Sequence, residues 1–498
     1  MTDVLAALET IFTFNSLFAI IIGTIGGIII GALPGLSSVM GLSILLPFTL
    51  SVDGMGGILM LLGIFCGSIY GGSISAILIN TPGTSASAAT ALDGYPLAVK
   101  YGQPGRALGI STYSSLFGGL FSCIVLIFLS PQLSKVALKF SAPEYFALAI
   151  FGISIITSVS SKSVIKGLIG GVFGLLLGTI GIDQITGAQR FTFGTVYLMR
   201  GISFIPLLIG VFAFSQGLLS IEESFFKKQE LIDVQVKKSF PSLSDQKKIL
   251  PTLIRSSLIG TFIGAVPGTG GDISSWFCYN EAKRWSKHKE QFGDGAIEGI
   301  AASESGNNAI SGGALVPLLS LGIPGDAGTA VMMGSLIVQG IAPGPLLFSE
   351  QAADVYTIFI GLFLANVFMG LFGFLGIKYF IKVINVPQSI LIPLIFTFCF
   401  VGTFALNNSL MDIIFMIAIG MVAYFLIKLE FSMPPIMLGL VLGPLAESNL
   451  RRSLLLSGGD PSIFFTRPIS LVFILLSIFS ILIPLFSPMF KKLRTVRK

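Results

Sequence analysis

The sequence predicts an all-α polytopic membrane protein with two inverted structural repeats, re-entrant hairpins and broken helices. Three observations support this fold class. Of the 498 residues, 53 % are hydrophobic and only 11 % are charged, whereas soluble proteins contain about a quarter charged residues. Pro-Gly motifs occur twice in the same order, and Lys and Arg residues are unevenly distributed along the chain. At about 20 apolar residues per crossing, we expect about 11 full spans plus two hairpins.

The composition also argues against other functional classes. The net charge of +6 is explained by the cytoplasmic Lys and Arg residues of a membrane protein, so we expect no nucleic-acid binding. The four cysteines are scattered through apolar segments, and the single histidine, His288, lies in a basic stretch. This spacing offers no zinc, haem or iron–sulfur site, so we expect no enzyme. The apolar segment from Ile11 follows no basic residue and no cleavage pattern, and we expect it to be retained.

Four segments of the first half recur in the second half in the same order. Two contain a Pro-Gly pair: GALPGLSS matches GAVPGTGG, and INTPGTSASA matches GIPGDAGTA. Two are apolar: SAPEYFALAIFG matches NVPQSILIPLIF, and FIPLLIGVF matches MPPIMLGLV. The matched ranges are 31–38 with 264–271, 79–88 with 322–330, 141–152 with 385–396, and 204–212 with 433–441. An internal repeat of this kind indicates that the two halves share one architecture.

The repeat divides the chain into four parts. They are a first transmembrane repeat (1–220), a cytoplasmic linker (221–255), a second, inverted transmembrane repeat (256–450), and a last transmembrane helix with a basic cytoplasmic tail (451–498). The linker is the one long polar stretch. Its lysines alternate with acids and apolar residues: Lys227, Lys228, Lys237, Lys238, Lys247 and Lys248.

Each half opens with two apolar segments that meet at a Pro-Gly pair, Pro34/Gly35 or Pro267/Gly268. In the second half these arms are expected at about 251–266 and 270–279. Both arms are shorter than the roughly 20 residues that a crossing needs. A re-entrant hairpin is therefore predicted, with two full spans as the alternative.

A helix broken at Pro82/Gly83 or Pro324/Gly325 follows each hairpin, and ordinary spans follow the break. The spans are expected to begin near Arg106, Glu144, Val164 and Ser203 in the first half, and near Val355, Gln388, Asp412 and Met433 in the second. A last span, 469–486, stands outside the repeat.

Each half is expected to cross the membrane an odd number of times, about five, so the second half must be inverted relative to the first. With the N-terminus outside and the C-terminus in the cytoplasm, most of the 30 Lys and Arg residues fall inside, as the positive-inside rule requires. The residues that fall outside are Lys135, Lys139, Arg190, Arg200, Arg451, Arg452 and Arg467.

The Pro-Gly breaks indicate a cavity inside the membrane. Backbone groups that leave a helix in a bilayer cost several kcal/mol each unless protein or trapped water satisfies them. One break alone is often a packing kink, but breaks at matching positions of inverted repeats are typical of secondary transporters that work by alternating access. In such proteins half-helix N-termini point at an anionic substrate, and unwound carbonyls hold a cation.

The candidate substrate site consists of the break residues and the small hydrogen-bonding residues beside them. Hydroxyl and amide groups donate to a carboxylate without the desolvation cost of a fixed cation. Amides inside apolar segments need partners, whereas a single Ser or Thr there often only packs. The candidates are Pro34, Gly35, Ser37, Ser38, Asn80, Thr81, Gly83, Thr84, Ser85, Gly268, Thr269, Asn307, Asn308 and Gly325.

Three acids near the breaks are candidates for coupling to a cation: Asp272, Glu304 and Asp326. A buried acid in a membrane costs on the order of 3 kcal/mol, so a functional role as a cation ligand or a proton carrier is the default. The alternative is that Asp272 and Asp326 cap the helices after their turns. The oxygens around the breaks, with Thr81 and Thr269, favour Na⁺ as the coupling ion, and H⁺ is the alternative. No other cofactor is expected.

Longer segments resemble one known family. They are LLPFTL at 45–50, YGGSISAILINTPGTSASAATALDGYPLAVKYGQPGRALG at 70–109, VPGTGGDISSWFCYNEAKRWSK at 266–287, FGDGAIEGIAASESGNNAISGGALVPLLSLGIPG at 292–325, and APGP at 342–345. These segments are similar to the large permease of the tripartite tricarboxylate transporters, over nearly the whole chain. The resemblance implies import of citrate or related tri- and dicarboxylates across the bacterial inner membrane, driven by an ion gradient. It also implies a small four-helix membrane subunit and a periplasmic solute-binding protein as partners, besides membrane lipid.

Two positions depart from the family pattern: Ser305/Gly306 replace an Ala-containing stretch before the Asn pair, and Asp326 stands where a small residue is usual after the last Pro-Gly. A carboxylate beside an anion site argues against a tricarboxylate as the substrate. Two other functions stay open: a channel, which the scarcity of charges in the spans disfavours, and a non-transporting membrane scaffold subunit. Association into a homodimer is also left open.

Overall fold

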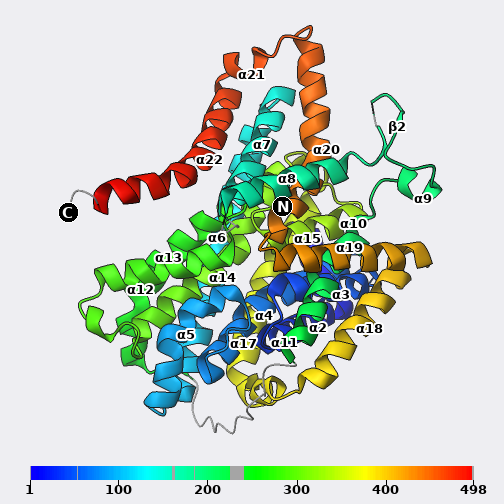
Figure 1. The fold of residues 1–498 in the computed structure, drawn as a ribbon. Coiled ribbons are helices and arrows are strands. Elements are labelled where there is room, and N and C mark those ends of the chain that lie inside the picture. Colours follow the sequence, from blue (N-terminus) through cyan, green and yellow to red (C-terminus); the bar gives the residue numbers. More distant parts are fainter. Residues whose placement is uncertain (1, 53, 160–162, 184, 225–239, 496–498) are drawn as a thin grey trace.

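The computed structural model describes residues 2–52, 54–159, 163–183, 185–224 and 240–495. Over these residues the chain is helical apart from loops and one short hairpin (Figure 1). Seven of the described helices are long and apolar enough to cross a membrane. The all-α membrane fold class is confirmed, whereas the span count and the inverted repeat stay predictions. The linker residues Lys227, Lys228, Lys237 and Lys238 lie outside the described residues.

Long helices form the main body of the molecule. They are α2 (Phe14–Ala32), α4 (Gly56–Ile79), α6 (Pro104–Ala137), α12 (Leu243–Ala265), α14 (Ile297–Leu321) and α17 (Ala352–Ile384). α2 packs on α4 and α12 packs on α14, while α6 lies against α14 and α17 against α4. α4 and α14 are buried along almost their whole lengths. The two helices that precede the predicted breaks therefore form the centre of the body.

Glycines allow these helix pairs to approach closely. A Cβ added at Gly27 of α2 would lie 2.4 Å from the carbonyl oxygen of Ile64 in α4. A Cβ added at Gly260 of α12 would lie 2.3 Å from the carbonyl oxygen of Gly306 in α14. Small residues are typical of such contacts in membrane proteins, because they let two backbones touch.

Both predicted broken helices are interrupted in the structure. α4 ends at Ile79, Asn80 has a φ of 52°, and helical structure resumes with η1 (Ser85–Ser87) and α5 (Ala88–Tyr95). α14 ends at Leu321, Gly322 has a φ of 71°, and α15 (Ala327–Val338) follows. Glycine and asparagine are the residues that most readily adopt this left-handed conformation at a helix C-terminus.

The first unit of each half is a longer helix followed by a shorter one. α2 is followed by α3 (Ser38–Leu50), and α12 by α13 (Gly270–Trp285). The prediction of short arms is wrong for α12, which begins at Leu243 and has 23 residues. The hydroxyl of Ser242 explains this early start, because it accepts a hydrogen bond from the backbone N–H of Asp245 at 3.1 Å and caps the helix. The last part of the predicted linker is therefore the start of α12.

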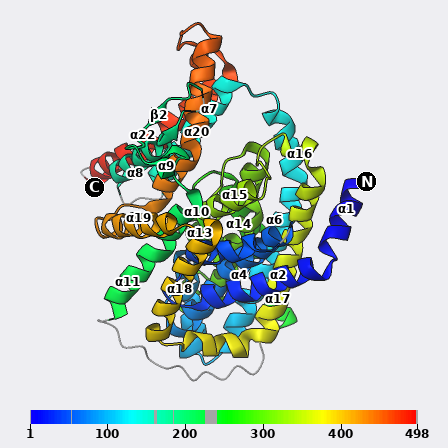
Figure 2. The same ribbon diagram turned by 90° about the vertical axis from the view of Figure 1, so that its right-hand side faces the viewer.

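A second group of helices projects from the body and is seen at the top of Figures 1 and 2. It contains α7 (Ala142–Val159), α8 (Val164–Gly178), α20 (Met433–Leu456), α21 (Ile463–Thr466) and α22 (Pro468–Thr495). α20 packs on α7 and α8, and α22 packs on α7. α20 also contacts α15 of the body, so the end of one broken helix lies where the two groups meet.

The remaining elements lie outside the two sets of helices described above. They are α1 (Thr2–Ile11), η2 (Pro96–Lys100), β1 (Gly181–Ile182), β2 (Gln189–Arg190), α9 (Val196–Met199), α10 (Phe204–Leu208), η3 (Ile209–Phe214), α11 (Ser215–Ser224), η4 (Lys289–Gln291), α16 (Leu347–Glu350), α18 (Gln388–Asn407) and α19 (Leu410–Lys428). β1 pairs with β2 in an antiparallel hairpin, with Gly181 opposite Arg190. The sequence did not predict this hairpin, whereas the helices after each break begin within a few residues of the predicted positions.

Candidate functional site

The segments that follow the four Pro-Gly pairs all begin at one cavity of about 360 Å³, which we call the break cavity. Its polar wall consists of the first residues of α3, η1, α13 and α15 and the residues just before them. These are Ser37, Ser38, Thr84, Ser85, Gly268, Thr269, Gly270, Gly271, Asp272, Asp326, Ala327 and Gly328. The first backbone N–H groups of a helix have no partner within the helix, and its N-terminal end carries partial positive charge. Several helix N-termini at one cavity therefore favour an anion there.

Side chains cap two of these helices. The hydroxyl of Ser37 accepts a hydrogen bond from the backbone N–H of Met40 at 3.1 Å, at the start of α3. The carboxylate of Asp326 accepts from the backbone N–H of Thr329 at 2.7 Å, and the Thr329 hydroxyl accepts from the backbone N–H of Asp326 at 2.9 Å. This reciprocal pair is a capping box at the start of α15. The interpretation of Asp326 as a helix cap is confirmed.

Asp272 has a different environment. It lies in the first turn of α13, where Thr269 holds the cap position, so the interpretation of Asp272 as a cap is wrong. Its carboxylate instead accepts a hydrogen bond from the Ser85 hydroxyl at 2.7 Å. This bond links the second half of the chain to the first across the break cavity, and the Asp272 side chain stays open to the cavity.

Asn307 supplies an unused hydrogen-bond donor. Its side chain lines the break cavity and is only 2 % exposed, yet its amide nitrogen has no partner in the described part of the protein. A buried donor without a partner costs about 1 to 3 kcal/mol. A ligand in the break cavity that accepts from this amide would recover that energy.

The ionisable side chains that line the break cavity are acidic. Asp272 and Asp326 line it, whereas no Lys, Arg or His is among the described residues that do so. The described residues also contain no group of three or more His, Cys, Asp or Glu side chains suited to a transition metal. The cavity thus combines helix N-termini, which favour an anion, with two carboxylates, which favour a cation.

The predicted site residues separate into two sets. Those that line the break cavity are Ser37, Ser38, Thr84, Ser85, Gly268, Thr269, Asp272, Asn307 and Asp326. Those that do not are Pro34, Gly35, Asn80, Thr81, Gly83, Glu304, Asn308 and Gly325.

The second set lies in the turns or behind the cavity. Asn80 and Thr81 are exposed, and the Thr81 hydroxyl donates to the carbonyl of Ile79 at 3.3 Å. The backbone N–H of Gly83 donates to the carbonyl of Gly72 at 3.2 Å. These residues shape the breaks and do not face the cavity.

The apolar wall of the break cavity was not predicted. It consists of Val39, Phe65, Ile69, Ala86, Phe212, Ile273, Ile310, Pro434 and Leu438, with the polar Ser432 beside them. Phe212 and Leu438 belong to the matched segments FIPLLIGVF and MPPIMLGLV. The match between these two segments was the sequence signal for this part of the wall, because the segments follow the Pro-Gly breaks in the same order in both halves.

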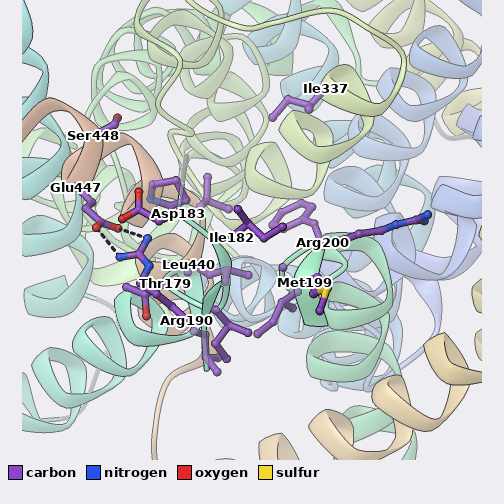
Figure 3. A pocket seen from close by; sticks show the side chains of 18 of the residues that line it. Thr179, Ile182, Asp183, Arg190, Met199, Arg200, Ile337, Leu440, Glu447 and Ser448 are labelled. Atoms are coloured by element: carbon purple, nitrogen blue, oxygen red, sulfur yellow. Dashed lines mark hydrogen bonds and ion pairs between the residues drawn. The ribbon is translucent and has the colours of Figure 1, made fainter. Parts of the chain in front are cut away.

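A second cavity of about 350 Å³ lies beside the β1–β2 hairpin, the end of α8 and the middle of α20. Figure 3 shows Arg190 facing Glu447, and Arg200 extending away from this pair. The Arg190 guanidinium lies 2.7 Å from Glu447, and the Arg451 guanidinium lies 2.7 Å from Asp183. The backbone N–H of Ile185 and the Arg451 guanidinium hold the pKa of the Asp183 carboxyl well below its usual range. These ion pairs connect the β1–β2 hairpin to α20, and their charged groups are therefore already engaged within the protein. The break cavity is the better candidate for a ligand-binding site.

Comparison with known proteins agrees with the predicted resemblance. A model of the family described as "Tripartite tricarboxylate transporter TctA family" matches residues 17–438. An uncharacterized 52.8 kDa protein in the TAR-I ttuC' 3' region of Agrobacterium vitis is 38 % identical over 462 residues, which cover 93 % of this chain and 91 % of that protein. An uncharacterized protein in the TAR-II ttuC' 3' region of the same organism is 37 % identical over 211 residues, covering 42 % of this chain and 87 % of that protein. No solved structure matches.

Proposed function

Because the chain belongs to the tripartite tricarboxylate transporter TctA family, we propose that it is the permease that imports carboxylates through the break cavity, driven by an ion gradient. The family is one of transporter subunits and not of enzymes. A large subunit of a tripartite transporter implies a small membrane partner and a periplasmic binding partner. We further propose that the small partner has four helices and that the assembly lies in the bacterial inner membrane.

The convergence of helix N-termini at the break cavity is the observation that carries this proposal. α3, α13 and α15 have 13, 16 and 12 residues, long enough to present N-terminal N–H groups and a helix dipole. Their N-termini, the hydroxyl of Ser38 and the free amide of Asn307 are donors for a carboxylate. Citrate and related tri- and dicarboxylates are the substrates that the family suggests.

The two carboxylates of the cavity support coupling to a cation. A carboxylate substrate would bring further negative charge to a cavity that already contains Asp272 and Asp326 and that no described Lys, Arg or His lines. A cation that enters with the substrate would offset this repulsion. We propose Na⁺ as this cation, with Asp272 and Thr269 among its ligands, and H⁺ as the alternative.

Replacing Asn307 by alanine tests the cavity directly. A hydrogen bond to a charged group contributes about 1.5 kcal/mol or more, so we expect carboxylate affinity to fall about tenfold. The thermal stability of the ligand-free protein should not fall, because the variant removes a donor that has no partner. Isothermal titration of the purified protein with citrate and other di- and tricarboxylates measures the first effect, and thermal unfolding measures the second.

Asn449→Ala is the matched control, because the Asn449 amide donates to the carbonyl of Leu445 at 2.8 Å and lies away from the break cavity. We expect this variant to bind carboxylates as the wild type does. Equal affinities of the Asn307→Ala variant and the wild type would show that the carboxylate does not bind at Asn307.

We also propose that the two halves are inverted repeats that move against each other in alternating access. Equivalent contacts in the two halves support this proposal. Gly27 of α2 packs against Ile64 of α4, and Gly260 of α12 packs against Gly306 of α14. Gly35 and Gly268, each the glycine of the first Pro-Gly pair in its half, both have a φ of 86°. Gly35 and Gly268 occupy the same place in the matched segments 31–38 and 264–271, and Gly27 and Gly260 each lie four residues before those segments.

Cysteine labelling tests the inverted orientation. Single cysteines at Ser244 and Ser349, which are both exposed, should react with a membrane-impermeant maleimide from opposite sides. Cys66, Cys123, Cys278 and Cys399 are all buried, so the native protein is its own unlabelled control. Labelling of both positions from the same side would rule out the inverted arrangement.

A further inference from the structure

Glu304 is a fully buried acid that the break cavity does not use. It lies in the middle of α14 with 0 % of its surface exposed. One carboxyl oxygen contacts the Thr90 hydroxyl of α5 at 2.5 Å, and the other accepts from the Ser115 hydroxyl of α6 at 2.9 Å. Ser115 itself accepts from the Asn308 amide at 2.9 Å. The carboxyl group is thus enclosed by neutral groups contributed by both halves of the chain.

Glu144 shows how this protein stabilises a buried carboxylate elsewhere. Its side chain is 2 % exposed, and the Arg467 guanidinium lies 2.5 Å from it. No described Lys, Arg or His forms an ion pair or hydrogen bond with Glu304. A carboxylate buried without a cation is strongly disfavoured, so its neutral, protonated form is favoured.

The hydrogen bonds around Glu304 fit both protonation states without movement of the heavier atoms. The Thr90 hydroxyl contacts both Glu304 and the Ser303 hydroxyl, the latter at 2.9 Å, and Ser303 can also donate to the carbonyl of Gly299 at 3.0 Å. Each hydroxyl has a single proton to donate. If Ser303 donates to Gly299, Thr90 donates to Ser303, and Glu304 must donate to Thr90 and so carry a proton. If Ser303 donates to Thr90, Thr90 donates to Glu304, which is then ionised.

Other ionisable groups face this region from the elements packed on α14. Tyr70 of α4 is hydrogen-bonded to Thr112 at 2.7 Å. The carboxylate of Asp93 in α5 accepts three backbone N–H groups, those of Gly293, Gly295 and Ala296. From the opposite face, Cys278 of α13 lies beside Ser274, and Arg255 of α12 stacks on Trp285. None of these groups supplies a positive charge to Glu304.

We propose that Glu304 is a proton-binding site, separate from the break cavity, and that it carries a proton in the conformation described here. The inference rests on the proposed transport function. Neighbouring residues of α14 face the two sites, with Asn307 at the cavity and Asn308 at the Glu304 cluster. A movement of α14 away from α5 and α6 would admit water and release the proton. Proton release would then accompany the conformational change, whichever cation enters the break cavity.

Infrared difference spectroscopy of the purified wild-type protein tests proton binding. We expect a carbonyl band of a protonated carboxyl group that persists at neutral pH and disappears in Glu304→Gln. The amide of glutamine can donate to Thr90 and accept from Ser115, as the neutral carboxyl does. Glu144→Gln is the matched control and should keep the band. Absence of the band in the wild type, or its persistence in Glu304→Gln, would overturn the proposal.

Ser115→Ala gives a second measurement that does not depend on the folding of Glu304→Gln. This change removes a hydroxyl that donates to the carboxyl group at 2.9 Å and binds its ionised form more strongly, so the change favours the protonated form. We expect the midpoint of the infrared titration to move to higher pH by about one unit. A midpoint that stays unchanged or moves to lower pH would contradict the assignment.

Uptake in vesicles connects the site to transport. An imposed proton gradient should accelerate citrate uptake by the wild-type complex, and this acceleration should be lost in Glu304→Gln. Retained acceleration in that variant would overturn the coupling role. If the wild type neither binds nor transports any carboxylate, the proposed function fails, whereas the infrared band still decides whether Glu304 binds a proton.

Discussion

Replacing Gly27 by alanine is expected to lower the thermal stability of the protein sharply, whereas the same change at the adjacent Gly26 is expected to be tolerated. The new Cβ at Gly27 would lie 2.4 Å from the carbonyl oxygen of Ile64 and 2.8 Å from its Cα, so α2 and α4 would have to separate. Both contacts are to backbone, which cannot move aside as a flexible side chain can. Overpacking of this kind costs about 1 to 3 kcal/mol, and more where the backbone must shift.

Gly26 is a close control because it lies on the same helix, one residue away. The nearest atom to its added Cβ would be the Leu45 Cδ1 at 3.7 Å, an ordinary contact. Alanine favours the helix over glycine by up to about 1 kcal/mol, so this variant should melt at the same temperature as the wild type or higher. Thermal unfolding of the detergent-purified proteins, followed by circular dichroism, measures both. Equal shifts in the two variants would show that the α2–α4 contact is not close.

Gly260→Ala extends the test to the second half of the chain. Its added Cβ would lie 2.3 Å from the carbonyl oxygen of Gly306, so the loss of stability should resemble that of Gly27→Ala. A similar loss at both positions would support equivalent roles for α2 with α4 and α12 with α14.

The breaks and the helices after them were predictable because they depend on local chemistry. Proline and glycine interrupt helices wherever they occur in an apolar segment, so the interruptions after Ile79 and Leu321 could be placed from the sequence. The match between the two halves then predicted that the breaks would belong together. The early start of α12 was missed because Ser242 follows a polar stretch and its capping role depends on a single hydrogen bond.

The division of polar residues between the cavity and its surroundings was not predictable from the sequence. Asn80 and Asn307 are both amides near a break, but Asn80 is exposed at the end of α4 while Asn307 faces the cavity from within α14. Which face of α14 is turned to the cavity depends on its packing against α6 and α12, which are distant in sequence. The same packing places Glu304 beside Thr90 and Ser115 and away from Asp272.

Asp272→Asn is expected to raise the sodium concentration for half-maximal uptake by more than about 100-fold, because the protein should bind the cation more weakly. The side chain of asparagine keeps an oxygen that can accept from the Ser85 hydroxyl, a bond of 2.7 Å in the wild type, so the link between the halves should persist. Only the charge is lost. If Asp272 pairs with the cation inside the protein, removing one partner of such a pair costs about 3 to 5 kcal/mol, which corresponds to more than about 100-fold in cation affinity.

Asp326→Asn separates a cation role from a capping role in the same cavity. Asparagine caps helices as well as aspartate does, so the reciprocal bonds with Thr329 should persist and the thermal stability should not change. Because the Asp326 carboxylate is engaged in these bonds, whereas Asp272 is open to the cavity, we expect a much smaller effect on the sodium concentration for half-maximal uptake. Asp294→Asn, at an exposed residue outside the cavity, is the control for loss of charge alone and should leave that concentration unchanged. Unchanged sodium dependence in Asp272→Asn would remove Asp272 from the cation site, and wild-type uptake that ignores sodium would leave the proton as the coupling ion.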